Sequence, residues 1–455
     1  MAPIAITPEP SRSATPQLKT PTTAWSPTED NVSSLTLAGI EHALPSKNAS
    51  SAGQAPLDAS LLQIELTQSP RAVPAPESPE VAAQKTCTDH MITARWTLEH
   101  GWHAPELKPY GAFSIMPTAS VLHYATECFE GLKLYRGFDG KLRLFRISRN
   151  CQRMRKSAAR IALPDFEPKE LEKLIIRLCA QDGEKWLPKE RPGSFLYVRP
   201  TCIATDEALG VQRPQEALLY VILACFPDMT KSKSAPAPPA LNGASNGTKK
   251  APSSGLKLLA STEDSIRAWP GGFGYAKVGA NYGPSLVAQG EARARGFDQV
   301  LWLFGSESYV TEAGASNFFV VWRNKTTGRL ELVTAPLEER IILEGVTRAS
   351  VLELTRSRLS EAMGDVEALD VVEKRFTMAD VVSAYREGRL VEAFAAGTAF
   401  FIAPVSLIHF RGEDLVVPTE EGESGVYTRV VKEWLVNIMY GKETHEWGVV
   451  VDEVA

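Results

Sequence analysis

The chain has 455 residues, a formal net charge of −5, 44% hydrophobic residues and 23% charged residues. This length allows two or more domains, and the composition is that of an ordinary globular protein. The charge excludes the strongly basic surface expected for binding nucleic acid or an anionic membrane. No apolar run is long enough to span a bilayer. The six cysteines are scattered without a CxxC pair, which argues against structural zinc and a disulfide framework and indicates a reducing compartment.

The N-terminal extension, residues 1–58, is expected to be disordered. It is rich in Pro, Ser, Thr and Ala without periodicity, so it cannot bury enough apolar surface to fold. A transit peptide would be Arg-rich and poor in acids, and this segment is not. We therefore expect a cytoplasmic protein, with a mitochondrial location as the alternative.

A small α/β domain is expected over residues 59–230. Its predicted strands are 91–96, 112–116, 141–145, 194–200 and 217–226, and its predicted helices are 150–162 and 168–181. Residues 231–255 are low in complexity and rich in Pro, Ala, Ser and Gly, which indicates an inter-domain linker or an expanded loop.

A larger domain is expected over residues 256–455. Its predicted helices are 285–295, 345–359, 378–387 and 426–439, and its predicted strands are 298–304, 318–322 and 371–376, with a strand-turn-strand passage over 391–404. Mixed strands and helices in two blocks predict an α+β protein of two domains rather than a regular βαβ winding.

A glycine-rich stretch near the domain junction, GGFGYAKVGANYG at 271–283, contains one lysine, Lys277. Glycines let the backbone turn sharply or approach a ligand closely. A partly desolvated lysine in such a loop can act as an amine nucleophile and form a Schiff base with a carbonyl compound. Taken alone, however, a lysine among glycines is more often a surface residue of a flexible loop.

A Schiff-base lysine that holds pyridoxal phosphate needs further partners. The pyridine nitrogen needs a carboxylate, and the phosphate needs backbone N–H groups and often an arginine. Each candidate has an ordinary structural explanation when it is taken alone, whereas together they favour a cofactor site. The candidates are Glu312 in a small-residue turn, Val346 and Thr347 at a helix start, Thr398 and Ala399 after an apolar strand, and Arg146 at a strand end.

The order of these motifs resembles that of the fold-type IV pyridoxal-phosphate aminotransferases. The pattern is GYAKVGANYG, QVLWL, TEAGASNFF, TAPL and GVTR. Further stretches are similar to the eukaryotic branched-chain amino-acid aminotransferases. Upstream these are CTDHMITARW, SVLHYATECFEGLKLYRG, RLFR and LYVRPTCIATDEALGV, and downstream they are AAGTAF and HEW. The likeness covers roughly residues 61 to 447 apart from 231–255.

The resemblance implies a role for each matching residue. Lys277 would bind pyridoxal phosphate covalently and move the proton at the substrate α-carbon. The remaining cofactor-binding residues would be Glu312 at the pyridine nitrogen, Tyr282 beside the ring and its hydroxyl, and Arg146, Val346, Thr347 and Thr398 at the phosphate.

The resemblance also implies a substrate pocket and a dimer. Tyr124, Phe129 and Tyr197 would line an apolar pocket, with Ala315 near the substrate carboxylate and Ala399 as a further substrate-binding residue. Arg199 would pair with the second carboxylate of glutamate when glutamate replaces the apolar amino acid. The expected substrates are branched-chain amino acids and 2-oxoglutarate or glutamate, and the expected assembly is a homodimer.

Some positions depart from the family pattern. Ala315 stands where a threonine is common, and Ala83 stands, in a loose alignment, where a phenylalanine often walls the pocket. Phe400 and Ala403 replace the CxxC pair of mammalian members, so a thiol switch is not expected there. These changes lie in or near the expected substrate pocket, whereas the expected catalytic residues match the family pattern. This combination is typical of a paralogue with a shifted substrate range.

Three functions remain open from the sequence. The first is transamination of branched-chain or related apolar L-amino acids, possible also in specialised metabolism. The second is another fold-type IV activity, that of a D-amino-acid aminotransferase or an aminodeoxychorismate lyase, against which the long upstream motifs argue. The third is a non-catalytic binding protein, against which Lys277 and Glu312 argue.

Overall fold

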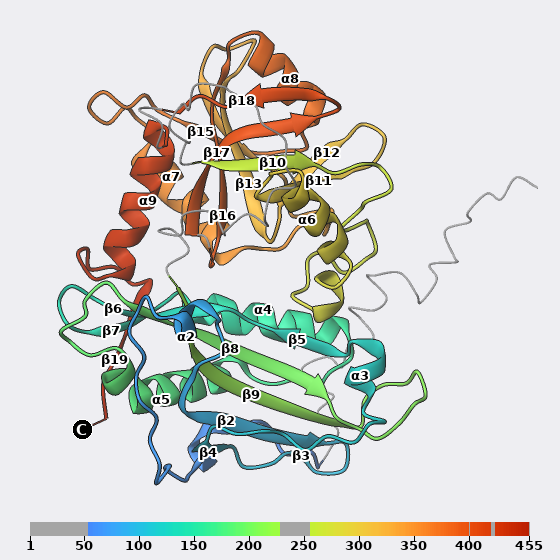
Figure 1. The fold of residues 1–455 in the computed structure, drawn as a ribbon, viewed down its shortest axis with the longest axis vertical. Coiled ribbons are helices and arrows are strands. Elements are labelled where there is room, and N and C mark those ends of the chain that lie inside the picture. Colours follow the sequence, from blue (N-terminus) through green and yellow to red (C-terminus); the bar gives the residue numbers. More distant parts are fainter. Residues whose placement is uncertain (1–52, 228–254, 400, 420–423, 455) are drawn as a thin grey trace, which may run out of the picture. The chain divides into compact units, whose positions relative to one another are not determined.

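The computed structural model describes residues 53–227, 255–399, 401–419 and 424–454 (Figure 1). The predicted linker lies outside these ranges except for Gly255, and so does most of the N-terminal segment predicted to be disordered. Order begins earlier than expected, because Leu57 is buried against the first hydrophobic core and Asp58 caps the short helix η1 (Ala59–Leu61).

The first sheet has ten strands in the order β1-β4-β2-β9-β8-β6-β7-β19, with β3 on β2 and β5 on β8. Apart from the parallel pair β1–β4, the pairs are antiparallel. The bounds are β1 (Gln63–Ile64), β2 (Cys87–Thr97), β3 (Gly101–Trp102), β4 (Glu106–Pro109), β5 (Glu127–Phe129), β6 (Leu132–Arg136), β7 (Leu142–Phe145), β8 (Phe195–Ala204), β9 (Glu216–Cys225) and β19 (Gly448–Val451).

Helices α4 (Ile147–Arg160) and α5 (Pro168–Trp186) cover one face of this sheet (Figure 1). Their buried apolar residues recur every three or four positions, as in Cys151 and Met154 of α4 and Leu174 and Leu178 of α5. Each fully buried side chain of this size contributes about 1.5–3 kcal/mol. Short helices α2 (Pro79–Ala82) and α3 (Ser120–Tyr124) lie in the connections.

The second sheet has nine strands in the order β12-β11-β10-β17-β16-β13-β14-β15, with β18 on β17. A further pairing of β12 with β13 closes six of them into a ring. The bounds are β10 (Leu256–Ala260), β11 (Gln299–Phe304), β12 (Tyr309–Ala313), β13 (Ser316–Arg323), β14 (Leu330–Thr334), β15 (Asp370–Glu373), β16 (Leu390–Gly397), β17 (Phe401–Phe410) and β18 (Glu413–Val416).

Four longer helices accompany the second sheet: α6 (Ser285–Ala294), α7 (Val346–Arg358), α8 (Met378–Arg386) and α9 (Val426–Met439). Helices α7 and α9 share one core with β13 and β16, in which Phe319 and Phe394 stack at 4.8 Å. Helix α8 packs on the core inside the ring of strands and begins with a capping box at Thr377.

The structure confirms the α+β class and nearly all predicted elements within a few residues of their expected ends. The predicted strand 112–116 is wrong, because these residues form no ladder. Strand β4 ends at Pro109, which has no N–H group to donate, and the following Phe113 packs its ring on Tyr220 at 5.0 Å. Strand β19 was not predicted; it joins the first sheet although it lies in the expected second domain.

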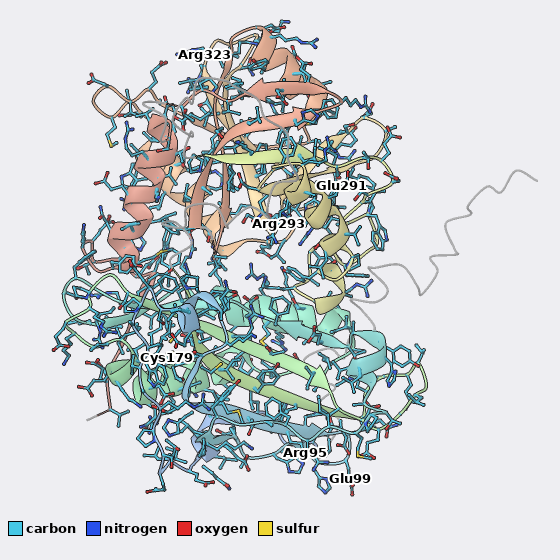
Figure 2. The ribbon with its side chains drawn as sticks, viewed as in Figure 1. Arg95, Glu99, Cys179, Glu291, Arg293 and Arg323 are labelled. Carbon is cyan, nitrogen blue, oxygen red and sulfur yellow. The ribbon has the colours of Figure 1, made fainter. Side chains whose placement is uncertain are left out.

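Many charged side chains lie at the surface, whereas the thiol side chains lie in the interior (Figure 2). Arg95 and Arg323 have exposed side chains, whereas Cys179 is buried between α5 and the first sheet. All six cysteines are free thiols in buried positions, and burial raises the pKa of Cys179. Within the described ranges, no helix combines the length and the apolar character needed to cross a membrane.

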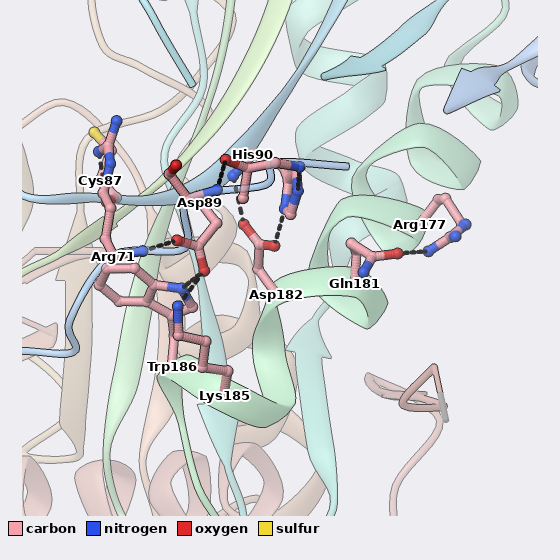
Figure 3. Close-up of polar contacts among 11 residues, drawn as sticks. Arg71, Cys87, Asp89, His90, Arg177, Gln181, Asp182, Lys185 and Trp186 are labelled. Carbon is pink, nitrogen blue, oxygen red and sulfur yellow. Dashed lines mark hydrogen bonds and ion pairs between the residues drawn. The ribbon is translucent and has the colours of Figure 1, made fainter. Parts of the chain in front are cut away.

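A buried polar network connects the segment that holds Thr67 and Arg71, and helix α5, to strand β2 (Figure 3). His90 accepts the Thr67 N–H at Nε2 at 3.0 Å, so its Nδ1 carries the proton and donates to Asp182 at 2.6 Å. Asp182 also accepts the His90 N–H. The neighbouring Asp89 accepts from the Arg71 N–H, Lys185 and Trp186.

Replacing Asp182 with alanine is expected to lower the free energy of unfolding by about 2–4 kcal/mol, because His90 loses both partners for its ring and backbone donors inside the protein. Denaturant unfolding measures this change. Glu184→Ala is the matched control, since Glu184 is exposed on the same helix, and should change stability by less than about 0.5 kcal/mol. Equal effects of the two variants would show that the network contributes nothing specific.

Candidate active site

The backbone of Lys277 is held by helix α4 and by strand β5 of the first sheet, although Lys277 lies between β10 and β11 of the second sheet. Its N–H donates to the Ser157 hydroxyl in α4 at 2.8 Å, and its carbonyl accepts the Phe129 N–H of β5 at 3.1 Å. The next residues pass against β5 so closely that a Cβ on Gly279 would lie 1.9 Å from a Glu127 oxygen. A side chain at position 279 would therefore displace the Glu127 carboxylate, and the main chain of Lys277 is held by both α4 and β5.

The Lys277 amine faces two aromatic rings. Its Nζ donates to the Tyr282 hydroxyl at 2.9 Å and lies 4.8 Å from the centre of the Phe129 ring. Tyr282 and Phe129 contact each other with their ring centres 5.1 Å apart. Burial raises the pKa of the Tyr282 phenol, but the Lys277 ammonium and the Arg267 guanidinium outweigh it and bring this pKa below its usual value. The amine is thus paired with an acidified phenol.

Glu312 lies at the end of β12, where β12 and β13 close the ring of strands. Its Oε1 accepts from the Leu343 N–H at 3.2 Å and from the Asn317 amide at 3.3 Å, and its Oε2 is ion-paired with Arg267. Burial raises the pKa of the Glu312 carboxyl above its usual value, against the opposing effects of Arg267, the Leu343 N–H and Lys277. The negative charge of Glu312 raises the pKa of the Tyr282 phenol, whereas the Lys277 ammonium lowers it.

The start of α7 is open for an anionic group. Its N-cap is Gly345, which offers no side chain to the first N–H groups, those of Val346 and Thr347. A Cβ on Gly345 would lie 2.1 Å from the Asn317 amide oxygen, so the helix starts directly against β13. A cavity at this point is lined by Val346, Thr347, Thr398, Lys133 and Asn150, together with Leu132, Tyr135, Phe145, Phe401 and Met439.

Arg146 contacts α7 further along than the first turn. It is the N-cap of α4, lies over the Trp447 ring at 3.9 Å, and donates to Ser350 at 3.0 Å and to Glu353 at 2.8 Å. Burial lowers the pKa of its guanidinium, although Glu353 opposes this. The predicted role of Arg146 at a phosphate therefore stays a prediction.

Arg153, which the sequence analysis did not select, reaches the start of α7 directly. Its guanidinium donates to the Glu344 carbonyl at 2.8 Å, immediately before the N-cap Gly345. It also forms two 2.7 Å hydrogen bonds with the buried carboxylate of Glu130. One turn later on α4, Ser157 holds Lys277, so this helix face serves both the lysine and the helix start.

Arg199 lies between two aromatic rings of the expected substrate pocket. Its guanidinium is 4.6 Å from the Phe129 ring centre and 5.0 Å from that of Tyr197, and its Nη2 donates to the Tyr197 hydroxyl at 3.1 Å. Within the described ranges its Nε is buried without a hydrogen-bond partner and no carboxylate pairs with it. The absence of a Cβ on Gly131 leaves room for the Tyr197 hydroxyl.

The other predicted substrate residues lie further out. Tyr124 in α3 is 40% exposed and its hydroxyl donates to the Leu209 carbonyl. Ala315 is exposed in the turn between β12 and β13, and Ala399 follows the end of β16 with its carbonyl 3.4 Å from the Lys133 amine. Ala83 is exposed at the end of α2. The roles of these residues remain predictions.

The aminotransferase class IV family matches residues 127–408, a range that holds Lys277, Glu312 and the start of α7. The chain belongs to this family. It is 42% identical to the mitochondrial branched-chain-amino-acid aminotransferase of Schizosaccharomyces pombe over 87% of this chain and 86% of that protein. It is 43% identical to the cytosolic enzyme of Saccharomyces cerevisiae over 88% and 99% of the respective chains. The family resemblance inferred from the motifs is confirmed.

Solved structures of class IV aminotransferases have the same fold. The branched-chain aminotransferase of Thermoproteus uzoniensis, solved with norvaline, aligns with a TM-score of 0.56 and 24% identity over 79% of this chain and 99% of that chain. The enzyme of Thermobaculum terrenum, solved in its PLP form, aligns with a TM-score of 0.56 and 21% identity over 80% and 98% of the respective chains. The predicted two-domain fold-type IV architecture is confirmed.

Proposed function

We propose that this chain transfers the amino group of branched-chain or related apolar L-amino acids to 2-oxoglutarate, which yields 2-oxo acids and L-glutamate. The observation that carries this function is the convergence of Lys277 and of the Arg267–Glu312 pair on Tyr282, within a chain that belongs to the class IV family. The named relatives favour this activity over that of a D-amino-acid aminotransferase or an aminodeoxychorismate lyase.

The residues present fit pyridoxal 5′-phosphate. The Lys277 amine, beside Phe129 and Tyr282, would bind the carbonyl group of the cofactor, and the buried Glu312 carboxylate could accept from a pyridine N–H. The uncapped start of α7 and its cavity, with Val346, Thr347 and Thr398, suit a phosphate. When bound, the cofactor supplies an electron sink for negative charge at the substrate α-carbon.

The side chains of this chain supply the remaining chemistry. Lys277 Nζ removes the proton from the substrate α-carbon and returns a proton, as general base and then general acid. Tyr282 holds the amine by their hydrogen bond, and its lowered phenol pKa favours the acceptor form. Glu312 keeps negative charge at the pyridine nitrogen, and the ring of Phe129 limits the access of water to the amine.

Arg199 explains how one pocket serves two kinds of substrate. Its guanidinium lies over the rings of Phe129 and Tyr197, and the remaining surface of these rings can contact a branched side chain. Its unpartnered Nε is available to the second carboxylate of glutamate or 2-oxoglutarate.

Arg153 is proposed as the arginine that supports the phosphate, beside or in place of Arg146. We expect Arg153→Gln to raise the dissociation constant of pyridoxal phosphate about tenfold to a hundredfold, because a charge-assisted contact is worth about 1.5–3 kcal/mol. Arg146→Gln, the matched control, should raise it less than about threefold. Titration of the apoprotein with cofactor, followed by absorbance, measures both. The reverse order of effects would assign the phosphate to Arg146.

A panel of amino donors with 2-oxoglutarate tests the proposed activity. We expect turnover of leucine, isoleucine and valine. We also expect relatively good use of bulkier apolar donors, because Ala315 is smaller than the threonine common in the family and lacks its hydroxyl group. Ala315→Thr should improve kcat/KM for valine up to about tenfold, the worth of one recovered hydrogen bond of about 0.5–1.5 kcal/mol. Identical donor rankings in both proteins, with valine and leucine best, would leave an ordinary branched-chain enzyme.

A homodimer is proposed as the working assembly. Large apolar side chains are exposed at Leu209 and Val211, next to the Tyr124 contact, and at Leu286 and Val287 on α6. Such exposed apolar groups are typical of surfaces that bind another chain. Sedimentation of the purified protein tests this. We propose a cytosolic location, with mitochondria as the alternative, because the relatives include a cytosolic and a mitochondrial enzyme.

A further inference from the structure

Arg267 is a buried cation beside the expected catalytic residues. Its ion pair with Glu312 has side chains that are only 5% and 2% exposed. Its guanidinium also lies 5.9 Å from the centre of the Tyr282 ring. The Arg267–Glu312 pair thus connects the carboxylate expected at the pyridine nitrogen with the phenol that holds the Lys277 amine.

One small core positions two of the three donors to Glu312. Ala268, which follows Arg267, is buried with Ile341 and Ile342, and the next residue, Leu343, donates its N–H to Glu312 Oε1. A Cβ on Gly274 would lie 2.6 Å from the Ala268 Cβ and 2.9 Å from the Ile341 carbonyl, so the chain segments meet in direct contact. The guanidinium and the backbone N–H therefore reach the carboxylate from neighbouring positions in one packed unit.

Several charges surround Tyr282. Lys277 and Arg267 are cations beside it, Glu312 is the carboxylate paired with Arg267, and Arg153 of α4 interacts electrostatically with Tyr282 as well. Loss of the Arg267 guanidinium would leave Glu312 Oε2 buried without its donor, with the carboxylate held only through Oε1. It would also remove one of the cations that face the phenol and the amine.

We propose that Arg267 is a positioning residue that fixes the orientation and charge of Glu312 and, through Glu312 and Tyr282, tunes the Lys277 amine. The inference rests on the proposed function, because it assigns Glu312 to the cofactor nitrogen. Arg267 itself is not assigned to the reacting atoms.

The test compares Arg267→Met and Arg267→Lys in the cofactor-loaded enzyme and in a Glu312→Gln background. Arg267→Met should lower kcat about 10- to 100-fold with KM for leucine changed less than about threefold, the loss expected for a charge-assisted hydrogen bond. Removal of the cation should raise the pH midpoint of the visible absorbance band by about one unit. Arg267→Lys should recover most of both values.

The Glu312→Gln background decides whether Arg267 acts through Glu312. There, Arg267→Met should change kcat less than about threefold, since the partner charge is already absent. Full additivity of the two effects, or an unshifted absorbance midpoint in Arg267→Met, would overturn the proposal. If Arg267→Met does not fold, Arg267→Gln takes its place and must show the same coupling to Glu312.

Arg136→Met is the matched control, because Arg136 is also a buried arginine with one acidic partner, Glu453, but lies in the first sheet. It should lower the melting temperature without shifting the absorbance midpoint. An equal shift in this control would overturn the specific role of Arg267. Absence of donor turnover in the unaltered enzyme would instead contradict the proposed function, and the absorbance and cofactor readouts would still report on Arg267.

Discussion

Lys277→Ala is expected to abolish transamination, with a loss of about four orders of magnitude or more, while the protein still folds. The amine is the group that binds the cofactor covalently and moves the α-proton, and both contributions disappear together. The main-chain contacts of residue 277 with Ser157 and Phe129 do not depend on the side chain, so the fold should persist. The rate of glutamate formation from leucine and 2-oxoglutarate measures the loss of activity. The visible absorbance of the cofactor-loaded protein shows whether the covalent bond to the cofactor is missing.

Lys257→Ala serves as the control for Lys277→Ala, because Lys257 is an exposed lysine on β10 of the second sheet, outside the glycine-rich loop. It should keep both turnover and the visible band. Transamination at the normal rate in Lys277→Ala would contradict the assignment of the lysine and with it the proposed mechanism.

Glu312→Gln is expected to lower kcat about 100- to 1000-fold. The neutral amide cannot hold negative charge at the pyridine nitrogen, so the cofactor loses most of its capacity as an electron sink. The shape of the side chain is unchanged, and the Leu343 N–H can still donate to the amide oxygen. Kinetics with leucine at saturating cofactor separate this effect from weaker cofactor binding.

Glu331→Gln is the control for Glu312→Gln. Glu331 is another buried glutamate of the second sheet, hydrogen-bonded to Trp322 and Asn324, away from the lysine loop. It should leave kcat unchanged within about twofold. A Glu312→Gln enzyme with normal kcat would show that another group serves the pyridine nitrogen.

The sequence predicted residue types well and their spatial partners less well. Lys277 and Glu312 stand in motifs whose order alone identifies the family, and amphipathic periods place α4, α7 and α9 within a few residues. The period of a helix or strand reports which face is buried, but not which distant segment covers it. Strand β19 has no local signal that distinguishes the first sheet from the second.

The two arginines that sequence reasoning missed, Arg153 and Arg267, show the same limit. Arg153 and Arg146 lie on one stretch of sequence, and only their contacts separate the arginine that reaches Glu344 from the one that reaches Glu353. Arg267 follows the polar run STEDS at 261–265, so nothing in the local sequence marks it as a buried cation. A buried cation needs an anionic partner, and only the structure identifies that partner as Glu312.

The return of β19 to β7 delays completion of the first sheet during synthesis. The partners Arg136 and Glu453, which flank this pairing, are 317 positions apart. After β7 has been synthesised, one of its edges therefore stays unpaired until β19 leaves the ribosome. Such an unpaired edge is a template for association between nascent chains. Chaperone demand should accordingly depend on translation speed across the second half of the message, a dependence that pulse-labelling of newly made chains can measure.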